Sequence, residues 1–194
     1  MSHSYNNLMS SSANPRLDNL LAALSLALAD EGNAAMARAA GLTGAAPLAL
    51  LALDEFLEAA TIGHLAEVLD LTHSGAVRLV TQLESAGLAT RRAGADRRNV
   101  EVRLTSAGRR RAREARAARD AVVVRTTAGL TSSESAALEG LLARLVEARV
   151  EARMERRRAG ERGPWLRRTC DLTACGRPEG RCPAQVTANR LMSP

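Results

Sequence analysis

The stretch of sequence that decides the fold is LAEVLDLTHSGAVRLVTQLESAGLATRRAGADRRNVEVRLTSAG, residues 65–108. It opens inside a short helix that is predicted to begin after the N-cap Thr61 and to stop at Asp70, and Thr72 then caps a second helix. The second helix places four apolar side chains on one face: Ala76, Val77, Val80 and Leu83. Two short helices joined by a tight turn predict a helix-turn-helix, whose second helix fits a DNA major groove about 12 Å wide.

The other face of this second helix is polar and carries short side chains that suit contacts with base edges and phosphates. Together with the capping residue, the candidate DNA-binding set on the helix is Thr72, His73, Ser74, Arg78 and Gln82. As an alternative to a DNA contact, His73 is simply the residue that follows the N-cap Thr72. The sequence therefore predicts double-stranded DNA as a partner.

After Gly87 the apolar pattern changes from the period of a helix to the period of two that is typical of strands. Residues 88–92 and 99–104 are predicted to form a hairpin with its turn at residues 93–96. The candidate DNA-binding residues on this wing are Arg92, Asp96, Arg97 and Arg98, and Arg91 adds a further positive charge. Such arginines neutralise phosphates or enter a minor groove. An exposed edge hairpin also carries charge simply to prevent aggregation.

Helices are predicted on both sides of this region. On the N-terminal side, leucines at spacings of three and four indicate a helix over residues 16–40, and a second helix follows Pro47. On the C-terminal side, an arginine-rich helix starts at Thr105, and a capping box of Thr131 and Glu134 starts another. We therefore expect a mainly α fold with a small β wing, that is, a winged helix-turn-helix plus a helical dimerisation layer.

The last of these helices carries an apolar stripe that so small a body cannot cover: Leu138, Leu141, Leu142, Leu145 and Val146. We expect the stripe to form a homodimer interface together with the first helix, so that two recognition helices lie roughly one DNA turn apart. The chain then divides into a disordered arm (1–15), an N-terminal dimerisation helix (16–44), a winged helix-turn-helix DNA-binding domain (45–104), C-terminal dimerisation helices (105–160) and a Cys-containing tail (161–194).

The composition agrees with a helical fold. Only Tyr5, Phe56 and Trp165 are aromatic among 194 residues, whereas Ala and Leu dominate. The net charge is +6, every one of the 27 basic residues is Arg, and residues 91–119 hold 11 of them against three acidic residues. An arginine block on a helix is by default a solvated face. The adjoining wing, rather than the block, therefore supports the prediction of DNA binding.

Two other function classes are alternatives, an enzyme and an architectural DNA protein. The sequence has no GxSxG, P-loop, HExxH or dinucleotide-binding motif, so catalysis is not expected. The arginine block would suit a protein that coats DNA without sequence choice. No segment offers the roughly 20 uncharged apolar residues of a membrane span, and the N-terminus lacks a secretory signal pattern. These features predict a cytoplasmic protein with no membrane partner.

Residues 65–108 resemble the MarR (multiple antibiotic resistance regulator) family of bacterial repressors. The similarity rests on three patterns that occur in family order, L-E-x-x-G-L, D-R-R and L-T-x-x-G, which comprise Leu83, Glu84, Gly87, Leu88, Asp96, Arg97, Arg98, Leu104, Thr105 and Gly108. The helix layout extends the similarity over roughly residues 16–157.

The resemblance implies a two-fold dimer that binds a short pseudo-palindrome. It also implies release by an unknown small-molecule effector or by oxidation, at the junction of the dimerisation and DNA-binding regions. By match to the motif, Ser74 and Arg78 would face the major groove, and Arg98 would probe the minor groove. Asp96 would orient the wing arginines, although it also suits a hairpin turn in its own right.

The C-terminal tail contains all three cysteines. Gly163 and Pro164 end the preceding helix, and the C-x4-C-x6-C spacing follows with Cys170, Cys175 and Cys182. This tail looks like a Cys-rich extension that some MarR relatives carry, usually with a further cysteine upstream. Zinc or an iron–sulfur cluster would need a fourth ligand, for which Asp171 or the other subunit is a candidate.

A redox role for the tail is the alternative to a metal site. Three arginines, Arg167, Arg168 and Arg181, are expected to lower the thiol pKa values and to make the cysteines sensitive to oxidation. The third interpretation is that the thiols are inert and the tail is flexible. The sequence does not decide among the three.

Overall fold

The computed structural model describes residues 14–93 and 100–192. Most of the predicted N-terminal arm and the wing tip with Asp96, Arg97 and Arg98 lie outside the described residues. The elements in chain order are α1 (Pro15–Ala40), α2 (Ala46–Glu55), β1 (Ala60–Thr61), α3 (Ile62–Leu69), α4 (His73–Ser85), β2 (Ala89–Ala93), β3 (Val100–Leu104), α5 (Ser106–Thr127), α6 (Ser132–Arg158) and α7 (Pro183–Met192). The fold is mainly helical with one small antiparallel sheet, which confirms the predicted fold class.

Threonine side chains set the start of four helices. In each case the hydroxyl accepts a hydrogen bond from the backbone N–H three residues later, as N-capping requires. The capping residues are Thr61, Thr72, Thr105 and Thr131, at the starts of α3, α4, α5 and α6. The predicted caps and the Thr131–Glu134 capping box are confirmed.

The sheet has the strand order β1-β3-β2, so β3 lies in the middle. Val102 of β3 is opposite Ala60 on one side and Arg91 on the other. The sequence predicted the β2–β3 hairpin but not β1, because two residues are too few to show an alternating pattern. Pairing with β1 places β3 against the core, where the Val102 side chain is completely buried.

The main core lies between α2, the helix-turn-helix and the sheet. Its fully buried large side chains include Leu50, Leu51, Leu65, Val68, Val80, Leu83 and Val102. Val77, predicted on the inward face of α4, is only half-buried, and Leu79 is buried instead. The apolar face of α4 is therefore wider than its spacing alone indicated, because α4 packs against β2 as well as α3.

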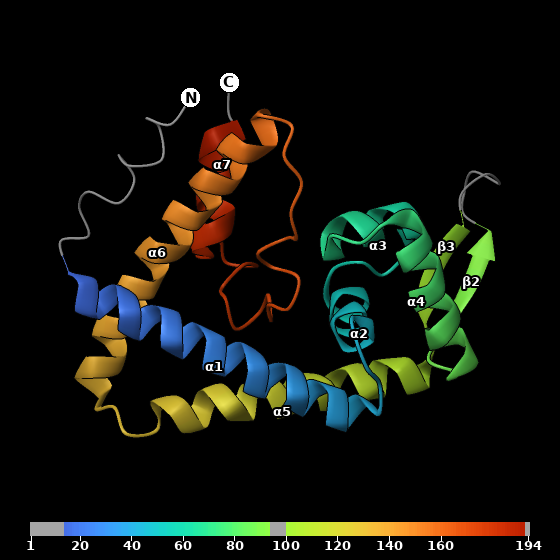
Figure 1. Ribbon diagram of the computed structural model, residues 1–194, viewed down its shortest axis with the longest axis horizontal. Coiled ribbons are helices and arrows are strands. Elements are labelled where there is room, and N and C mark those ends of the chain that lie inside the picture. Colours follow the sequence, from blue (N-terminus) through green and yellow to red (C-terminus); the bar gives the residue numbers. More distant parts are fainter. Residues whose placement is uncertain (1–13, 94–99, 193–194) are drawn as a thin grey trace, which may run out of the picture.

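Helices α1 and α5 lie side by side and antiparallel along the base of the molecule (Figure 1). The Arg111 guanidinium donates to the Ala39 carbonyl at 3.1 Å, and a Cβ on Gly32 would lie 3.4 Å from the Arg119 side chain. In this register, the first part of α1 extends beyond the end of α5. The leucines in the first half of α1 are exposed: Leu17, Leu20, Leu21, Leu24 and Leu26.

Length and composition also make α1 a candidate membrane span, contrary to the expectation that no segment is apolar enough. The second half of α1 nevertheless packs on the folded chain, since Gly32, Ala35, Met36 and Ala40 are buried. A helix of a packed layer passes the same test of length and hydropathy as a membrane span does. Its apolar character is therefore weak evidence for a membrane.

The C-terminal tail is folded. After α6 the chain runs back toward α2 and α3, and α7 then packs against α6 (Figure 1). Cys182, Ala184 and Thr187 are buried in this contact, and Arg190 forms an ion pair with Glu151 at 2.7 Å. The interpretation of a flexible tail is therefore wrong. The sequence did not predict α7, because its few apolar residues form no clear helical pattern and are buried through packing against α6.

Gly108 offers a test of the junction between the wing and α5. A Cβ at this position would lie 1.9 Å from the Leu88 carbonyl oxygen, so backbone would have to move. Gly108→Ala is expected to lower the free energy of unfolding by about 2–3 kcal/mol, measured by denaturant titration. The control is Gly140→Ala on α6, where nothing lies within 4 Å of the added Cβ; it should stabilise by up to about 1 kcal/mol. Equal effects of the two substitutions would contradict the close approach.

Candidate nucleic-acid interface

The start of α4 is a tightly built helix N-terminus. The Thr72 hydroxyl accepts from the Gly75 N–H at 3.1 Å and lies 3.2 Å from the Ser74 hydroxyl. A Cβ on Gly75 would itself lie only 3.1 Å from the Thr72 oxygen, so glycine permits this close cap. The unpaired N–H groups of the first turn carry partial positive charge, which favours an anion such as a DNA phosphate.

The structure places the predicted α4 residues together on one open surface. All of them are exposed, whereas the packing side of the helix is buried. The exposed set is Thr72, His73, Ser74, Arg78 and Gln82. A polar face about two turns long beside a capped N-terminus has the size and chemistry of a helix that reads a major groove.

Arg91 has a structural position that the sequence analysis missed. Its guanidinium forms an ion pair with Glu84 and donates to Thr81 at 2.9 Å, and its backbone N–H donates to Glu84 at 2.9 Å. These contacts join β2 to the second half of α4. The expectation that Arg91 adds to the free charge of the wing is therefore corrected: this arginine fixes the wing relative to α4.

Arg92 remains an exposed candidate on the wing. It lies opposite Glu101 in the sheet, and Glu101 in turn pairs with Arg103 at 3.0 Å. Arg92, Arg103 and Arg109 line one hollow at the edge of the sheet. Positively charged side chains of β2, β3 and the start of α5 therefore lie close together around this hollow.

Most of the α5 arginines serve internal contacts. Arg116 is nearly buried and pairs with Glu55 of α2 at 2.9 Å, while Arg119 pairs with Asp120 and donates to the Thr169 carbonyl. By contrast, Arg110 and Arg113 are exposed. The default interpretation of a solvated face is therefore right for part of the block only, because α1, α2 and the tail pack around the rest.

The tail is anchored on the helix-turn-helix by Trp165. Its backbone N–H donates to the Val68 carbonyl at 3.0 Å, and its ring stacks on Phe56 with centroids 6.2 Å apart. The edge of His64 meets the same ring at 5.6 Å, and Arg167 lies over it. Composition and periodicity alone did not predict this contact of the single tryptophan. A lone Trp just after a helix-ending Gly-Pro pair was the signal for an anchor.

The three cysteines are free thiols in the tail, and two of them touch. The Cys175 thiol donates to the Cys182 sulfur at 3.3 Å. Burial, this hydrogen bond and the neighbouring thiols raise the pKa of Cys175 to about 12. Burial also raises the pKa of Cys170, against the pull of Arg119 and Arg167. For Cys170 and Cys175, the expectation that nearby arginines lower the thiol pKa is therefore wrong, because burial outweighs their charge.

The expectation of a metal or cluster site finds no geometric support. Within residues 14–93 and 100–192, no three His, Cys, Asp or Glu side chains come together closely enough to hold a metal ion. The side chain of Asp171, the suggested fourth ligand, instead accepts from the Ala174 N–H at 2.8 Å. The carboxylate closes a turn of the tail.

Comparisons with known proteins agree with this geometry. The MarR family model matches residues 40–99. YusO from Bacillus subtilis superposes with a TM-score of 0.59 at 27% identity, over 75% of this chain and 99% of that chain. A MarR-family transcriptional regulator from Rhodococcus sp. RHA1 gives a TM-score of 0.54 at 26% identity, over 69% and 93% of the two chains. Residues 40–99 are thus similar to the MarR family, and the chain shares the fold of MarR-family structures.

A further similar structure was solved with a bound ligand. CouR from Rhodococcus jostii RHA1, solved bound to p-coumaroyl-CoA, gives a TM-score of 0.53 at 27% identity over 69% of this chain and 93% of that chain. A comparison with curated proteins finds no match. MarR-family proteins are transcription regulators and not enzymes, which confirms the prediction that the chain is not an enzyme.

The raised thiol pKa predicts slow alkylation of Cys175. A thiol with a pKa of about 12 stays protonated where an ordinary cysteine, at 9.0, begins to ionise, and only the thiolate reacts. We expect iodoacetamide to modify Cys175 at least about tenfold more slowly in the folded protein than in urea at pH 8. The folded-state rate should still be rising at pH 10. Mass spectrometry of tail peptides measures both, and a plateau near pH 9 would contradict the burial.

Proposed function

We propose that this chain acts as a MarR-type regulator, a homodimeric, cytoplasmic repressor that binds a pseudo-palindromic DNA site and is released by a small molecule. The observation that carries the proposal is the exposed polar face of α4 at a capped helix N-terminus. Similarity to the MarR family supports transcription regulation as the general activity. The operator, the direction of regulation and the effector are the proposed steps beyond it.

Base contacts are assigned to α4 and backbone contacts to the wing. Ser74 and Arg78 lie on the exposed face that would enter the major groove, and Thr72, His73 and Gln82 flank them. Arg92 is placed to meet a phosphate on the wing side. Arg98 as the minor-groove residue, with Arg97 and Asp96 beside it, completes the proposed interface beyond the described residues.

A second copy of the chain is the proposed partner of the helical layer. Exposed apolar side chains collect on the free half of α1 and on α6, and these two segments lie at the end of the molecule away from the wing (Figure 1). On α6 they are Leu141, Leu142 and Leu145. Groups of exposed leucines on helices mark an interface rather than a solvated face. This supports α1 and the helices from 105 to 160 as the dimerisation layer.

An apolar effector has a cavity available beside this layer. A hollow of about 840 Å³ lies between α6 and the tail and includes Leu138, Leu142, Val146, Cys170 and Cys182 in its lining. This volume is within the range of small-molecule sites. The tail also contacts α2 and α3, so a ligand bound here could shift the tail and, through it, the DNA-binding domain. That a relative was solved with p-coumaroyl-CoA supports a ligand-responsive role.

Oxidation of the tail is a second candidate for the releasing event. The 3.3 Å contact between the Cys175 and Cys182 sulfur atoms favours it. A peroxide would oxidise one thiol to a sulfenic acid with loss of water, and the second thiol would displace a further water to form the disulfide. The raised pKa of Cys175 makes this reaction slow until the tail opens. DNA binding with and without peroxide, in wild type and C175S, tests this route.

The DNA proposal is tested by site selection from random duplexes followed by titration. The wild type should prefer the selected site over random duplex by at least about 10³ at physiological salt. Arg78→Ala should weaken that preference by about 1–3 kcal/mol, whereas Arg38→Ala, an exposed arginine on α1, should leave it unchanged. Equal wild-type affinity for both duplexes would favour the architectural alternative.

The dimer proposal is tested by adding charge to α6. Leu141→Arg changes a side chain that is 55% exposed in the single chain, so the monomer should tolerate it. A buried unpaired charge in a dimer costs several kcal/mol, so sedimentation should show monomers at micromolar concentration. The control Ala136→Arg adds the same charge at an exposed position on another side of α6 and should sediment as the dimer. A monomeric wild type would overturn the proposal.

A further inference from the structure

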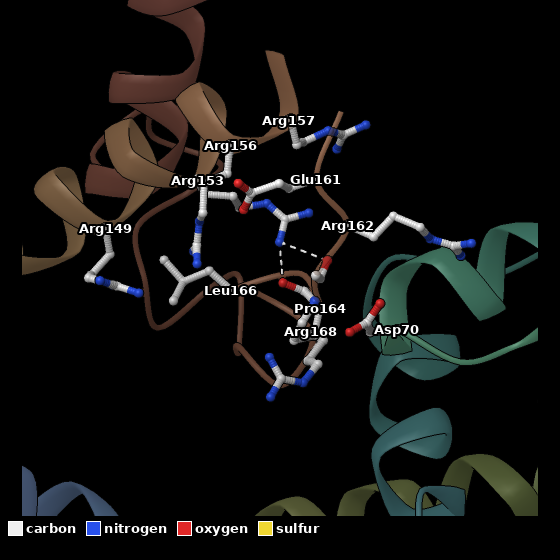
Figure 2. Close-up of a pocket in the computed structure, with 11 residues that line it drawn as sticks. Asp70, Arg149, Arg153, Arg156, Arg157, Glu161, Arg162, Pro164, Leu166 and Arg168 are labelled. Atoms are coloured by element: carbon white, nitrogen blue, oxygen red, sulfur yellow. Dashed lines mark hydrogen bonds between the residues drawn. The ribbon is translucent and has the colours of Figure 1, made fainter. Parts of the chain in front are cut away.

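An arginine-lined hollow lies where α6, the start of the tail and the end of α3 meet (Figure 2). Its volume is about 360 Å³, and a neighbouring hollow of about 430 Å³ shares several of its residues. Six arginines line it against two carboxylates, those of Asp70 and Glu161. The arginines are Arg149, Arg153, Arg156, Arg157, Arg162 and Arg168.

The chain supplies too few acceptors for these six cations. Arg157 pairs with Glu67 at 3.2 Å, Arg153 donates to the Gly163 and Pro164 carbonyls, and Arg168 donates to the Trp165 carbonyl. Within the described part of the chain, Arg149, Arg156 and Arg162 have no hydrogen-bond or ion-pair partner. Half of the arginines around the hollow are therefore available to an external anion.

The lowered pKa of Arg153 agrees with an excess of positive charge around the hollow. Its pKa is lowered mainly by burial, and the charges of Arg157, Arg156 and Arg168 add to the effect against the opposing charge of Glu67. Like charges held close together are stabilised when an anion enters between them. Guanidinium groups in particular bind phosphate through paired, charge-assisted hydrogen bonds.

We propose that this hollow is a binding site for a small molecule that carries two or more linked phosphate groups. A single monovalent anion would leave most of the positive charge unbalanced, and the hollow is large enough for a diphosphate group. A DNA duplex is the less suitable occupant, because the arginines line a hollow from two segments, α6 and the 161–168 segment, rather than following one exposed line (Figure 2).

The hollow borders the helix-turn-helix, so a bound ligand could affect the position of α3 and α4. Asp70, which lines the hollow, is the left-handed residue that ends α3, two residues before the cap of α4. The Arg157–Glu67 pair and the Trp165–Val68 hydrogen bond connect the same segments. An effect on DNA binding rests on the proposed function, whereas phosphate binding itself does not. The experiment therefore measures binding without DNA.

The probe is inorganic pyrophosphate, titrated calorimetrically into the full-length protein. The test variant carries Arg149→Gln and Arg156→Gln, which remove two unpartnered charges and none of the described contacts. We expect binding to weaken at least about tenfold, since each of the two guanidinium groups would supply charge-assisted hydrogen bonds to the phosphate oxygens. The control carries Arg110→Gln and Arg113→Gln on α5, which change the net charge equally at exposed positions outside the hollow. It should bind pyrophosphate within about twofold of wild type.

Thermal unfolding provides a second measurement on the wild type. Pyrophosphate should raise its melting temperature, and sulfate at the same ionic strength should raise it less. Absence of pyrophosphate binding, or equal weakening in both double variants, would overturn the proposal. So would a parallel tenfold loss of random-duplex affinity in the Arg149/Arg156 variant, because it would make the arginines part of a DNA-binding surface.

Discussion

The hydrogen bonds around the Leu88 carbonyl are the interaction on which the arrangement of the whole chain depends. This oxygen accepts from the Thr105 N–H at 3.0 Å, the Thr105 hydroxyl donates to the Gly87 carbonyl at 2.8 Å, and Gly108 has no Cβ to obstruct them. The contacts join the exit of α4 to the start of α5. Since α5 in turn carries α1 and leads to α6, they fix the DNA-binding domain relative to the helical layer.

The same contacts explain two of the short patterns by which the family is recognised. In L-E-x-x-G-L, Glu84 holds Arg91 of β2, and Leu88 offers its carbonyl oxygen to the next motif. In L-T-x-x-G, Thr105 caps α5 and Gly108 permits the close approach. The two patterns therefore supply the two sides of one backbone junction, which the hydrogen bond from Thr105 to Leu88 joins.

Arginine serves three different purposes in this chain, and its environment decides which. Arg91 joins β2 to α4, and Arg116 holds α2 against α5 through Glu55. Arg78 and Arg92 are exposed toward the proposed DNA face, while Arg149 and Arg156 border a hollow at the far end of the helix-turn-helix. In a protein without lysine, charge counts along the sequence cannot separate these purposes, because every basic position carries the same residue type.

The sequence by itself determined the starts of α3, α4, α5 and α6, the helix-turn-helix and the hairpin, because caps and periodicity act through neighbours within a few residues. Only the tertiary structure decided the tail, where Trp165 stacks on Phe56 and α7 packs on α6. The same holds for the raised pKa of Cys175, which the arginines nearby in sequence had suggested would fall. Burial and long-range contact depend on which distant segments meet, and residue spacing does not encode that.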